Sequence, residues 1–366
     1  MSELKNFLPK KIFEFLSKSV LGQDDVLKYV SVALYRHINH SKADNILLIG
    51  NSGTGKTTIM KAIKAFYDAY EDLKIFRVMV IMNANMLIGE DEADVQCIRL
   101  FKNIENKVRT LWGKDINEET LKEYMENATV CLDEIDKISA KISGKVNVSG
   151  IAIQQALLTI MEGETVIYET AITENGKVKN IKIPLDTSRL LFICGGAFEE
   201  LYDQVYNQVV NPSEKRKLKP QIVVGKKGVS FESKFSLKEF LAFEDLFRYG
   251  MVPQFISRFS AMVVLNNLSV ENLKAILKNA ADSPYRDSKE YFGTMNIDLN
   301  LSEDAIELIA THAAESTRIG ARALREVFSK MITALEFDPF SSEKVVKDGD
   351  RYTLAITKEV AEKALK

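Results

Sequence analysis

Short apolar runs alternate along the chain with longer segments in which apolar residues recur at helical spacing. The short runs cover residues 45–50, 76–82, 129–132 and 190–194. Continuous apolar runs of this length are typical of strands that are buried on both faces of a sheet. Segments with helical periodicity separate or precede them, chiefly residues 9–40, with a break at 21–25, and 151–161. This alternation of strands and helices predicts an α/β fold built on a parallel sheet.

The pattern changes near residue 267, where helical periodicity becomes dominant. Helices are predicted over residues 269–280, 302–314 and 320–337. Residues 352–356 alternate apolar and polar side chains as a strand does. We therefore expect two domains, a large α/β domain over residues 1–265 and a smaller, mostly helical α+β domain over residues 266–366.

The composition narrows the class of protein. A chain of 366 residues is too long for one ordinary hydrophobic core, and 46% hydrophobic with 27% charged residues is typical of globular proteins. Lys and Arg number 49 against 51 Asp and Glu, so no overall positive charge favours nucleic acid or an anionic membrane. Residues 211–234 are rich in Lys, Gly and Pro and are expected to form an exposed loop, with a basic cluster at residues 215–219.

The sequence shows none of the features typical of secreted or membrane proteins. Cys97, Cys131 and Cys194 lie far apart and form no C-x-x-C pair, so neither a zinc module nor a disulfide framework is expected. No stretch approaches the roughly 18 to 20 apolar residues that span a bilayer, and the polar N-terminus does not resemble a signal peptide. We expect a cytoplasmic protein with neither a membrane nor a nucleic acid as its partner.

A glycine-rich segment directly after the first predicted strand carries the strongest chemical signal. Residues 50–57 read GNSGTGKT and match the phosphate-binding pattern G-x-x-x-x-G-K-[ST], between a strand and a helix as that pattern requires. Glycines allow successive backbone N–H groups to surround a phosphate, and the helix presents its positive end to the anion. We expect Lys56 to contact the β- and γ-phosphates of ATP and Thr57 to bind Mg²⁺. The residues expected to bind nucleotide here are Asn51, Ser52, Gly53, Thr54, Gly55, Lys56, Thr57 and Thr58.

Two acidic residues follow the apolar run at residues 129–132. Asp133 is expected to hold Mg²⁺ through water, and Glu134 to orient and deprotonate the attacking water. An apolar run that ends in two acids is a weak signal alone, since acidic residues often end strands. Together with the glycine-rich segment, it favours hydrolysis of a nucleoside triphosphate over binding alone.

Several further strings closely resemble the ClpX family of AAA+ protein unfoldases. The longest are LDEIDKI at residues 132–138, DTSRLLFICGGAF at 186–198 and VPQFISR at 252–258. The resemblance extends to VLGQ at residues 20–23, QQALL at 154–158 and GARALR at 320–325. These strings follow one another in the family's order over nearly the whole chain.

The resemblance implies a P-loop AAA+ large domain followed by a small domain, and a homohexameric ring that holds ATP between its subunits. It implies that Arg258 is an arginine finger that reaches the γ-phosphate on a neighbouring subunit. It also implies that Arg322 is the second sensor arginine, from the small domain. Both positions need a guanidinium that stays charged and forks onto phosphate oxygens. Val20 and Leu21 are implied to line the adenine pocket, where the alternative is ordinary core packing.

The chain departs from the family in the segments that touch substrate. We expect an ATPase core without the family's N-terminal zinc-binding domain. The family's aromatic pore loop corresponds to residues 83–90, where Met86, Leu87 and Ile88 are present and no aromatic residue occurs. The second pore loop corresponds to residues 145–150 and has lost charge relative to the family.

Two further family loops are altered. The basic loop at the pore entrance is not recognisable between residues 164 and 182. The loop that docks the peptidase ClpP is matched only in part by GVSF at residues 228–231. The sequence therefore supports docking of a ClpP-like peptidase only through this partial match.

Three functions remain open from the sequence. The first is an ATP-driven ring motor that unfolds or remodels a protein partner. The second is an ATP-gated assembly or signalling module that switches a dedicated partner without threading it, which the altered pore segments favour. The third, ranked lower, is the unfoldase subunit of a ClpP-like protease. A nucleic-acid motor is disfavoured because the sequence has no basic groove and no aromatic stacking series.

Overall fold

The chain folds into two compact units. The computed structural model describes residues 7–365 except 41–43, 88–97, 114–115, 143, 175–176, 211–220, 226–227, 233–234, 281, 317–319, 342–343 and 350. The first unit comprises Met1–Leu16, Asp25–Gly50 and Lys56–Leu265. The second unit comprises Ser17–Asp24, Asn51–Gly55 and Asn266–Lys366.

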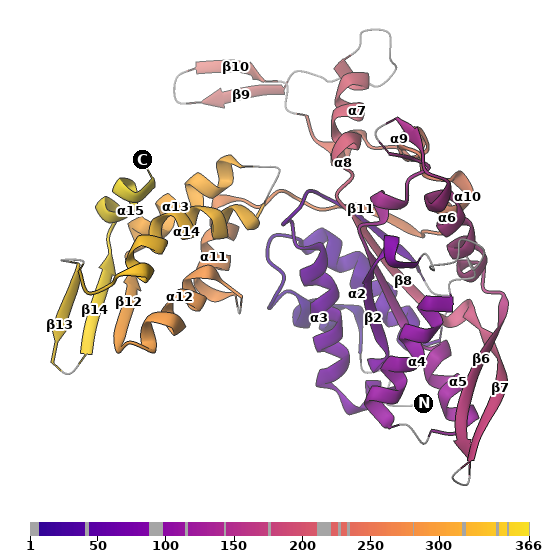
Figure 1. Ribbon diagram of the computed structural model, residues 1–366. Coiled ribbons are helices and arrows are strands. Elements are labelled where there is room, and N and C mark those ends of the chain that lie inside the picture. Colours follow the sequence, from indigo (N-terminus) through magenta and orange to yellow (C-terminus); the bar gives the residue numbers. More distant parts are fainter. Residues whose placement is uncertain are drawn as a thin grey trace. The chain divides into compact units, whose positions relative to one another are not determined.

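A five-stranded parallel sheet forms the centre of the first unit (Figure 1). Its strands are β1 (Ile46–Ile49), β2 (Met79–Asn83), β3 (Thr129–Asp133), β8 (Leu191–Gly196) and β11 (Ala261–Val264). They lie in the order β11-β1-β8-β3-β2, and every neighbouring pair is parallel. The parallel α/β fold predicted from the sequence is confirmed.

The central strands are apolar because both of their faces are covered. Every residue of β1 and β8 is buried, as are the first four residues of β3. The helices packed around the sheet include α2 (Asp24–Ile38), α3 (Lys56–Ala69) and α4 (Ile98–Trp112). The strand predicted at residues 76–82 is wrong at its start, because Glu71–Arg77 form the 3-10 helix η2.

Short elements connect the strands and helices of the first unit. Those on the carboxyl side of β2 and β3 are η3 (Ala84–Leu87), η4 (Ile135–Ile138), β4 (Lys141–Ile142), β5 (Lys145–Val146) and α6 (Val148–Met161). The others are α1 (Pro9–Leu16), α5 (Glu118–Glu126), η5 (Thr187–Arg189), α7 (Glu199–Val210), α8 (Leu237–Phe240), α9 (Phe243–Tyr249) and α10 (Pro253–Ile256).

A long β-hairpin occupies the region where the sequence shows no recognisable pore-entrance loop. Its strands β6 (Thr165–Glu174) and β7 (Lys177–Asp186) pair antiparallel along their whole length (Figure 1). The hydroxyl groups of Tyr168 and Thr170 each donate to the carboxylate of Glu105 on α4 at 2.6 Å. Glu105 is buried, so these hydrogen bonds satisfy its carboxylate and fix the hairpin to α4.

A second hairpin lies in the segment that was expected to be an exposed loop. Strands β9 (Gln221–Gly225) and β10 (Gly228–Glu232) pair antiparallel, so the expectation of a loop is wrong for this part of residues 211–234. The partial match to the ClpP-docking loop lies within β10. The basic residues Lys215, Arg216, Lys217 and Lys219 lie outside the described residues.

The second unit contains five helices and a three-stranded sheet among its described residues. The helices are α11 (Val270–Asn279), α12 (Pro284–Gly293), α13 (Glu303–Glu315), α14 (Arg322–Phe337) and α15 (Lys358–Leu365). The strands lie in the order β12 (Ile297–Leu301), β14 (Arg351–Ile356) and β13 (Val345–Asp348). The smaller α+β fold is confirmed, although the sequence had indicated only β14 of its strands.

Two of the three cysteines lie among the described residues. Cys131 and Cys194 are free, and burial raises the pKa of both thiols above the usual range. Cys97 lies outside the described residues. None of the described helices combines the length and the apolar composition needed to cross a bilayer.

His37 on α2 is buried, with Nε2 3.5 Å from Thr129 Oγ1 at the start of β3, and it makes the free energy of unfolding depend on pH. Desolvation lowers the pKa of its imidazole from 6.5 to about 4. The unfolded chain therefore binds more protons than the folded chain between these two pH values. We predict that stability falls by roughly 1.4 kcal/mol per pH unit as the pH decreases through this window. Above pH 6.5 the imidazole is neutral in both states, and its contribution is constant.

A His37→Gln variant isolates this contribution from the other titrating groups. Urea unfolding of both proteins between pH 7.5 and 4.5 measures the difference in their free energies of unfolding. We expect the advantage of the wild-type protein to shrink as the pH falls below 6.5. Parallel pH profiles for the two proteins would contradict the prediction.

Candidate nucleotide-binding and catalytic site

The glycine-rich loop follows β1 and leads into α3. Gly53 and Gly55 have φ angles of 74° and 107°, in the left-handed region that favours glycine. The backbone N–H of Thr54 donates to Asn51 O at 3.3 Å and its hydroxyl donates to the same oxygen at 2.8 Å, which closes a tight turn. Such a turn before a helix N-terminus can direct several backbone N–H groups at one anion.

Lys56 is the first residue of α3 and is largely buried, with 8% of its surface exposed. Its ammonium group donates to the carbonyl oxygen of Gly50. The long side chain is thus folded back along the loop, and its charge lies at the carboxyl end of β1. A buried cation in this position provides a point charge for phosphate oxygens.

Thr57 and Asp133 meet at the edge of the sheet. Thr57 Oγ1 donates to Asp133 Oδ2 at 2.7 Å, although the two residues are 76 positions apart. A hydroxyl and a carboxylate oxygen at this distance are suitable ligands for Mg²⁺, which usually takes one or two protein oxygens and completes its shell with phosphate and water. The residues present therefore fit the metal that the sequence predicts here.

Glu134 is held in an unusual backbone conformation beside them. Its φ angle is 56°, which is uncommon for a residue with a side chain and is often found at functional sites. Asn83 Nδ2 donates to Glu134 Oε2 at 3.2 Å. Asn83 is paired with Asp133 in the register of β2 and β3, so the amide lies next to the acidic pair.

Asn83 was named in the sequence only as the first residue of a pore segment. Its role as a partner of Glu134 was missed. The available signal was its place at the end of a strand, since parallel strands end at the same edge of the sheet. The structure thus brings Lys56, Thr57, Asp133 and Glu134 together, with Asn83 added.

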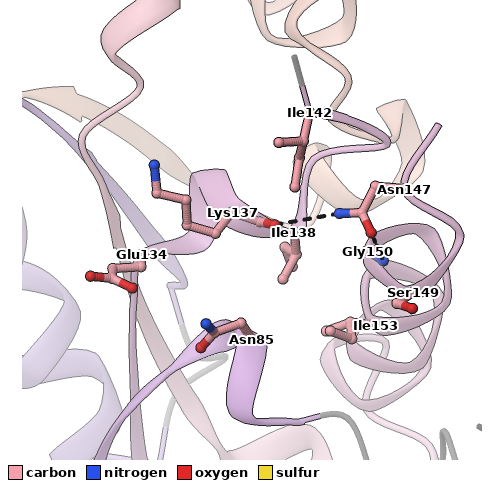
Figure 2. A pocket seen from close by; sticks show the side chains of 9 residues that line it. All are labelled: Asn85, Glu134, Lys137, Ile138, Ile142, Asn147, Ser149, Gly150 and Ile153. Carbon is pink, nitrogen blue, oxygen red and sulfur yellow. Dashed lines mark hydrogen bonds between the residues drawn. The ribbon is translucent and has the colours of Figure 1, made fainter. Parts of the chain in front are cut away.

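Glu134 also lines a cavity of about 520 Å³ (Figure 2). The other lining residues are Asn85, Lys137, Ile138, Ile142, Asn147, Ser149, Gly150 and Ile153. Figure 2 shows Glu134 on one side of this cavity and Asn147, with the start of α6, on the other. The cavity therefore connects the candidate general base with residues from both segments that were compared with pore loops.

Gly195, near the end of β8, leaves room for the lysine and the aspartate. A Cβ atom at this position would lie 3.4 Å from Lys56 Cδ, 3.6 Å from Asp133 Oδ1 and 3.3 Å from Met60 Cε. Any larger side chain would compete with Lys56 for this space. Gly195 lies in a string that resembles the family, but nothing in the sequence indicated its packing role at the site.

The two candidate arginines, Arg258 and Arg322, belong to different units of the structure. Arg258 follows α10, and its guanidinium donates to the carboxylate of Glu162. Glu162 is not one of the site residues Lys56, Thr57, Asp133 and Glu134. Arg322 is exposed at the first position of α14. Within the second unit, the preceding residue Ala321 donates its backbone N–H to Gly53 O at 3.0 Å. The chain segment that carries Arg322 thus contacts the glycine-rich loop.

The residues expected at the adenine pocket lie before Gln23 in the second unit. Val20 is buried and Leu21 is partly buried. Gln23 is fully buried, and its side-chain amide donates to Thr54 O at 3.0 Å. The segment around Val20 and Leu21 is therefore tied to the glycine-rich loop through Gln23.

The geometry describes a P-loop ATPase, and sequence comparisons define it further. Residues 41–262 match the family model of the AAA domain (Cdc48 subfamily). The chain is an ATP hydrolase of the AAA+ class.

Curated relatives identify the family within this class. The chain is 30% identical to "ATP-dependent Clp protease ATP-binding subunit ClpX" of Treponema denticola, over 90% of this chain and 77% of the relative. It is 29% identical to the Borrelia duttonii protein of the same name over 93% and 76% of the two chains, and 28% identical to that of Bacteroides thetaiotaomicron over 97% and 82%. The chain belongs to the ClpX family.

The packing at Gly195 yields a prediction for nucleotide affinity. We expect Gly195→Val to displace the Lys56 side chain and to weaken ATP binding by about tenfold, which corresponds to about 1.4 kcal/mol and lies within the range that overpacking costs. Titration with a fluorescent ATP analogue measures the dissociation constant. Gly293→Ala is the control, because a Cβ at Gly293 would meet no atom within 4 Å. Equal affinity of Gly195→Val and the wild-type protein would overturn the assignment.

Proposed function

We propose that this protein is an ATP-dependent ring motor of the cytoplasm that unfolds or remodels protein partners. The observation that carries the proposal is the meeting of Thr57 and Asp133 at 2.7 Å, directly before Glu134, in a chain of the ClpX family. In the proposal, residues 1–265 are the large ATPase domain and residues 266–366 are the small domain that contributes the second sensor.

The nucleotide chemistry follows from the side chains at the sheet edge. The loop of residues 51–58 and Lys56 bind the phosphates of ATP, and Val20 and Leu21 line the adenine pocket. Thr57 and Asp133 hold Mg²⁺, which neutralises charge on the phosphates when it is bound. Glu134 accepts a proton from the attacking water, while Asn83 orients its carboxylate.

The two arginines complete the site in an assembled ring. We infer a homohexamer in which Arg258 contacts the γ-phosphate of ATP on the neighbouring subunit. Arg322 contacts the phosphates from the small domain, at the first turn of α14. A guanidinium suits both positions because it remains charged and donates several hydrogen bonds in a fixed plane.

The segments compared with pore loops supply an apolar rather than an aromatic surface. Met86 is 57% exposed, whereas Leu87 is only 3% exposed and packs in the core. Leu87 therefore does not provide the peptide contact that the sequence suggested, and Ile88 lies outside the described residues. Val146 at the end of β5 and Val148 at the start of α6 are 70% and 72% exposed. We propose that Met86 and these valines contact the polypeptide.

Two alternative functions differ from this proposal in the protein partner that they require. An ATP-gated switch would act on one dedicated protein without threading it. The unfoldase subunit of a ClpP-like protease would dock a peptidase through the β9–β10 hairpin, whose GVSF string matches the docking loop only in part. The relatives are named as a subunit of the Clp protease, which supports the second alternative, and the altered pore segments support the first.

The assignment of the general base is tested by Glu134→Gln. The amide keeps the shape of the side chain but cannot accept a proton from water, so ATP hydrolysis is expected to fall by about 10²- to 10⁴-fold. ATP binding and assembly are expected to persist, as measured with a fluorescent ATP analogue and by light scattering. Lys56→Ala is the comparison variant, in which nucleotide binding itself is lost. Residual turnover at the wild-type rate in Glu134→Gln would refute the role of Glu134.

Binding of an unfolded polypeptide distinguishes a motor from a switch. In the Glu134→Gln background with ATP, labelled casein is expected to bind, and Met86→Ala combined with Val148→Ser is expected to weaken this binding by about tenfold. Fluorescence anisotropy measures the affinity. Val346→Ser is the matched control, because Val346 is 61% exposed on β13, in a segment that was not compared with any pore loop. Unchanged casein binding in the double variant would favour a switch over a threading motor.

A further inference from the structure

Glu162 is the side-chain partner of Arg258 among the described residues. Arg258 Nη2 donates to Glu162 Oε1 at 2.6 Å, and the two side chains are 38% and 35% exposed. Ion pairs with this degree of exposure contribute little to folding stability. We therefore consider the effect of the ion pair on the orientation of the Arg258 guanidinium.

The carboxylate lies on a rigid corner of the structure. Glu162 directly follows α6, and its backbone N–H donates to Leu158 O at 3.0 Å. The buried hydroxyl of Thr187 lies 2.8 Å from the carbonyl oxygens of both Ile160 and Glu164, one on each side of Glu162. The backbone that carries Glu162 is thus held by the end of α6 and by η5.

The backbone of Arg258 is fixed as well. Asn45 Nδ2, next to β1, donates to Arg258 O at 3.2 Å. The fully buried amide of Gln154 on α6 accepts from the backbone N–H of Val252 at 2.7 Å, at the start of α10. With both backbones held, the main remaining freedom of Arg258 is its side-chain rotamer, and Glu162 selects it.

We propose that Glu162 is a positioning residue that orients the Arg258 guanidinium toward the γ-phosphate of ATP on the neighbouring subunit. The inference rests on the proposed function, in which Arg258 acts across the subunit interface. Arginine has five N–H donors in a planar fork, so one carboxylate contact leaves donors for a phosphate. A rotamer that is selected in advance lowers the entropic cost of ordering the side chain when the phosphate contact forms.

Mixed rings separate the subunit that supplies Arg258 from the subunit that hydrolyses ATP. Lys56→Ala subunits retain Arg258 but lack a working nucleotide site. Arg258→Ala subunits retain the nucleotide site but supply no arginine. Neither variant is expected to hydrolyse ATP efficiently alone, and mixing them is expected to recover hydrolysis at the interfaces that combine both functional halves.

Glu162→Gln is then introduced into one kind of subunit at a time. In the Lys56→Ala subunit, which supplies the arginine, it is expected to lower the recovered kcat by about two- to tenfold, the cost of ordering one long side chain. The KM for ATP is expected to stay constant. Glu162→Asp is expected to recover part of the loss, because it restores the charge. In the Arg258→Ala subunit, the same Glu162→Gln substitution is expected to leave the recovered kcat unchanged.

The controls distinguish a failure of this inference from a failure of the proposed function. If the parent mixture recovers no hydrolysis, Arg258 does not act across the interface, and both proposals fall. If the parent mixture recovers but Glu162→Gln lowers kcat equally in either subunit, its role is structural and only this inference is overturned. An unchanged or increased kcat in the arginine-supplying subunit overturns it too. Glu164→Gln is the matched control and is expected to have no effect, since the Glu164 carboxylate has no hydrogen-bond or ion-pair partner among the described residues.

Discussion

The parallel direction of the five central strands is the constraint on which the candidate site depends. Parallel strands bring their carboxyl ends to one edge of a sheet, so residues far apart in the sequence end side by side. Gly50, Asn83, Asp133 and Gly195 reach this edge from β1, β2, β3 and β8. The hydrogen bond from Thr57 to Asp133 then joins the start of α3 to the end of β3. An antiparallel arrangement of the same strands would divide these groups between two edges.

Two buried side-chain amides connect the elements around the sheet with one another and with the central strands. Asn45 accepts from Phe192 N at 3.0 Å and donates to Arg258 O, so it ties the arginine segment to the central strands. Gln154 donates to Ile138 O at 2.7 Å and accepts from Val252 N, which joins η4 to α10. A buried amide with both ends paired tolerates little displacement, because an unpaired polar group in the interior is costly.

The sequence predicted the site residues that belong to short local motifs. It missed residues whose place depends on tertiary packing. Lys56, Thr57, Asp133 and Glu134 belong to short motifs with a direct physical reason, and the structure brings these four residues together. Asn83 and Glu162 were missed because a single amide or carboxylate has no distinctive local pattern, and its partner is fixed only by tertiary structure. The burial of Leu87 was missed for the same reason, since an apolar residue in a short segment can face either the core or solvent. The strands of the β6–β7 hairpin are rich in charged and polar residues, which weakened their hydrophobic signal. The strands β9 and β10 have only five residues each and lie in a segment whose Lys, Gly and Pro content indicated a loop.

Helix α6 would link neighbouring nucleotide sites in a ring of identical chains. Its first turn borders the cavity that contains Glu134, and its last residues lead to the carboxylate that holds Arg258. A helix of 14 residues spans about 21 Å, so one rigid rod connects the two places. In the proposed ring, one end of this rod serves the subunit's own nucleotide and the other serves the nucleotide of its neighbour. In such a ring, every α6 would point from one interface to the next in the same rotational sense, because the chains are identical.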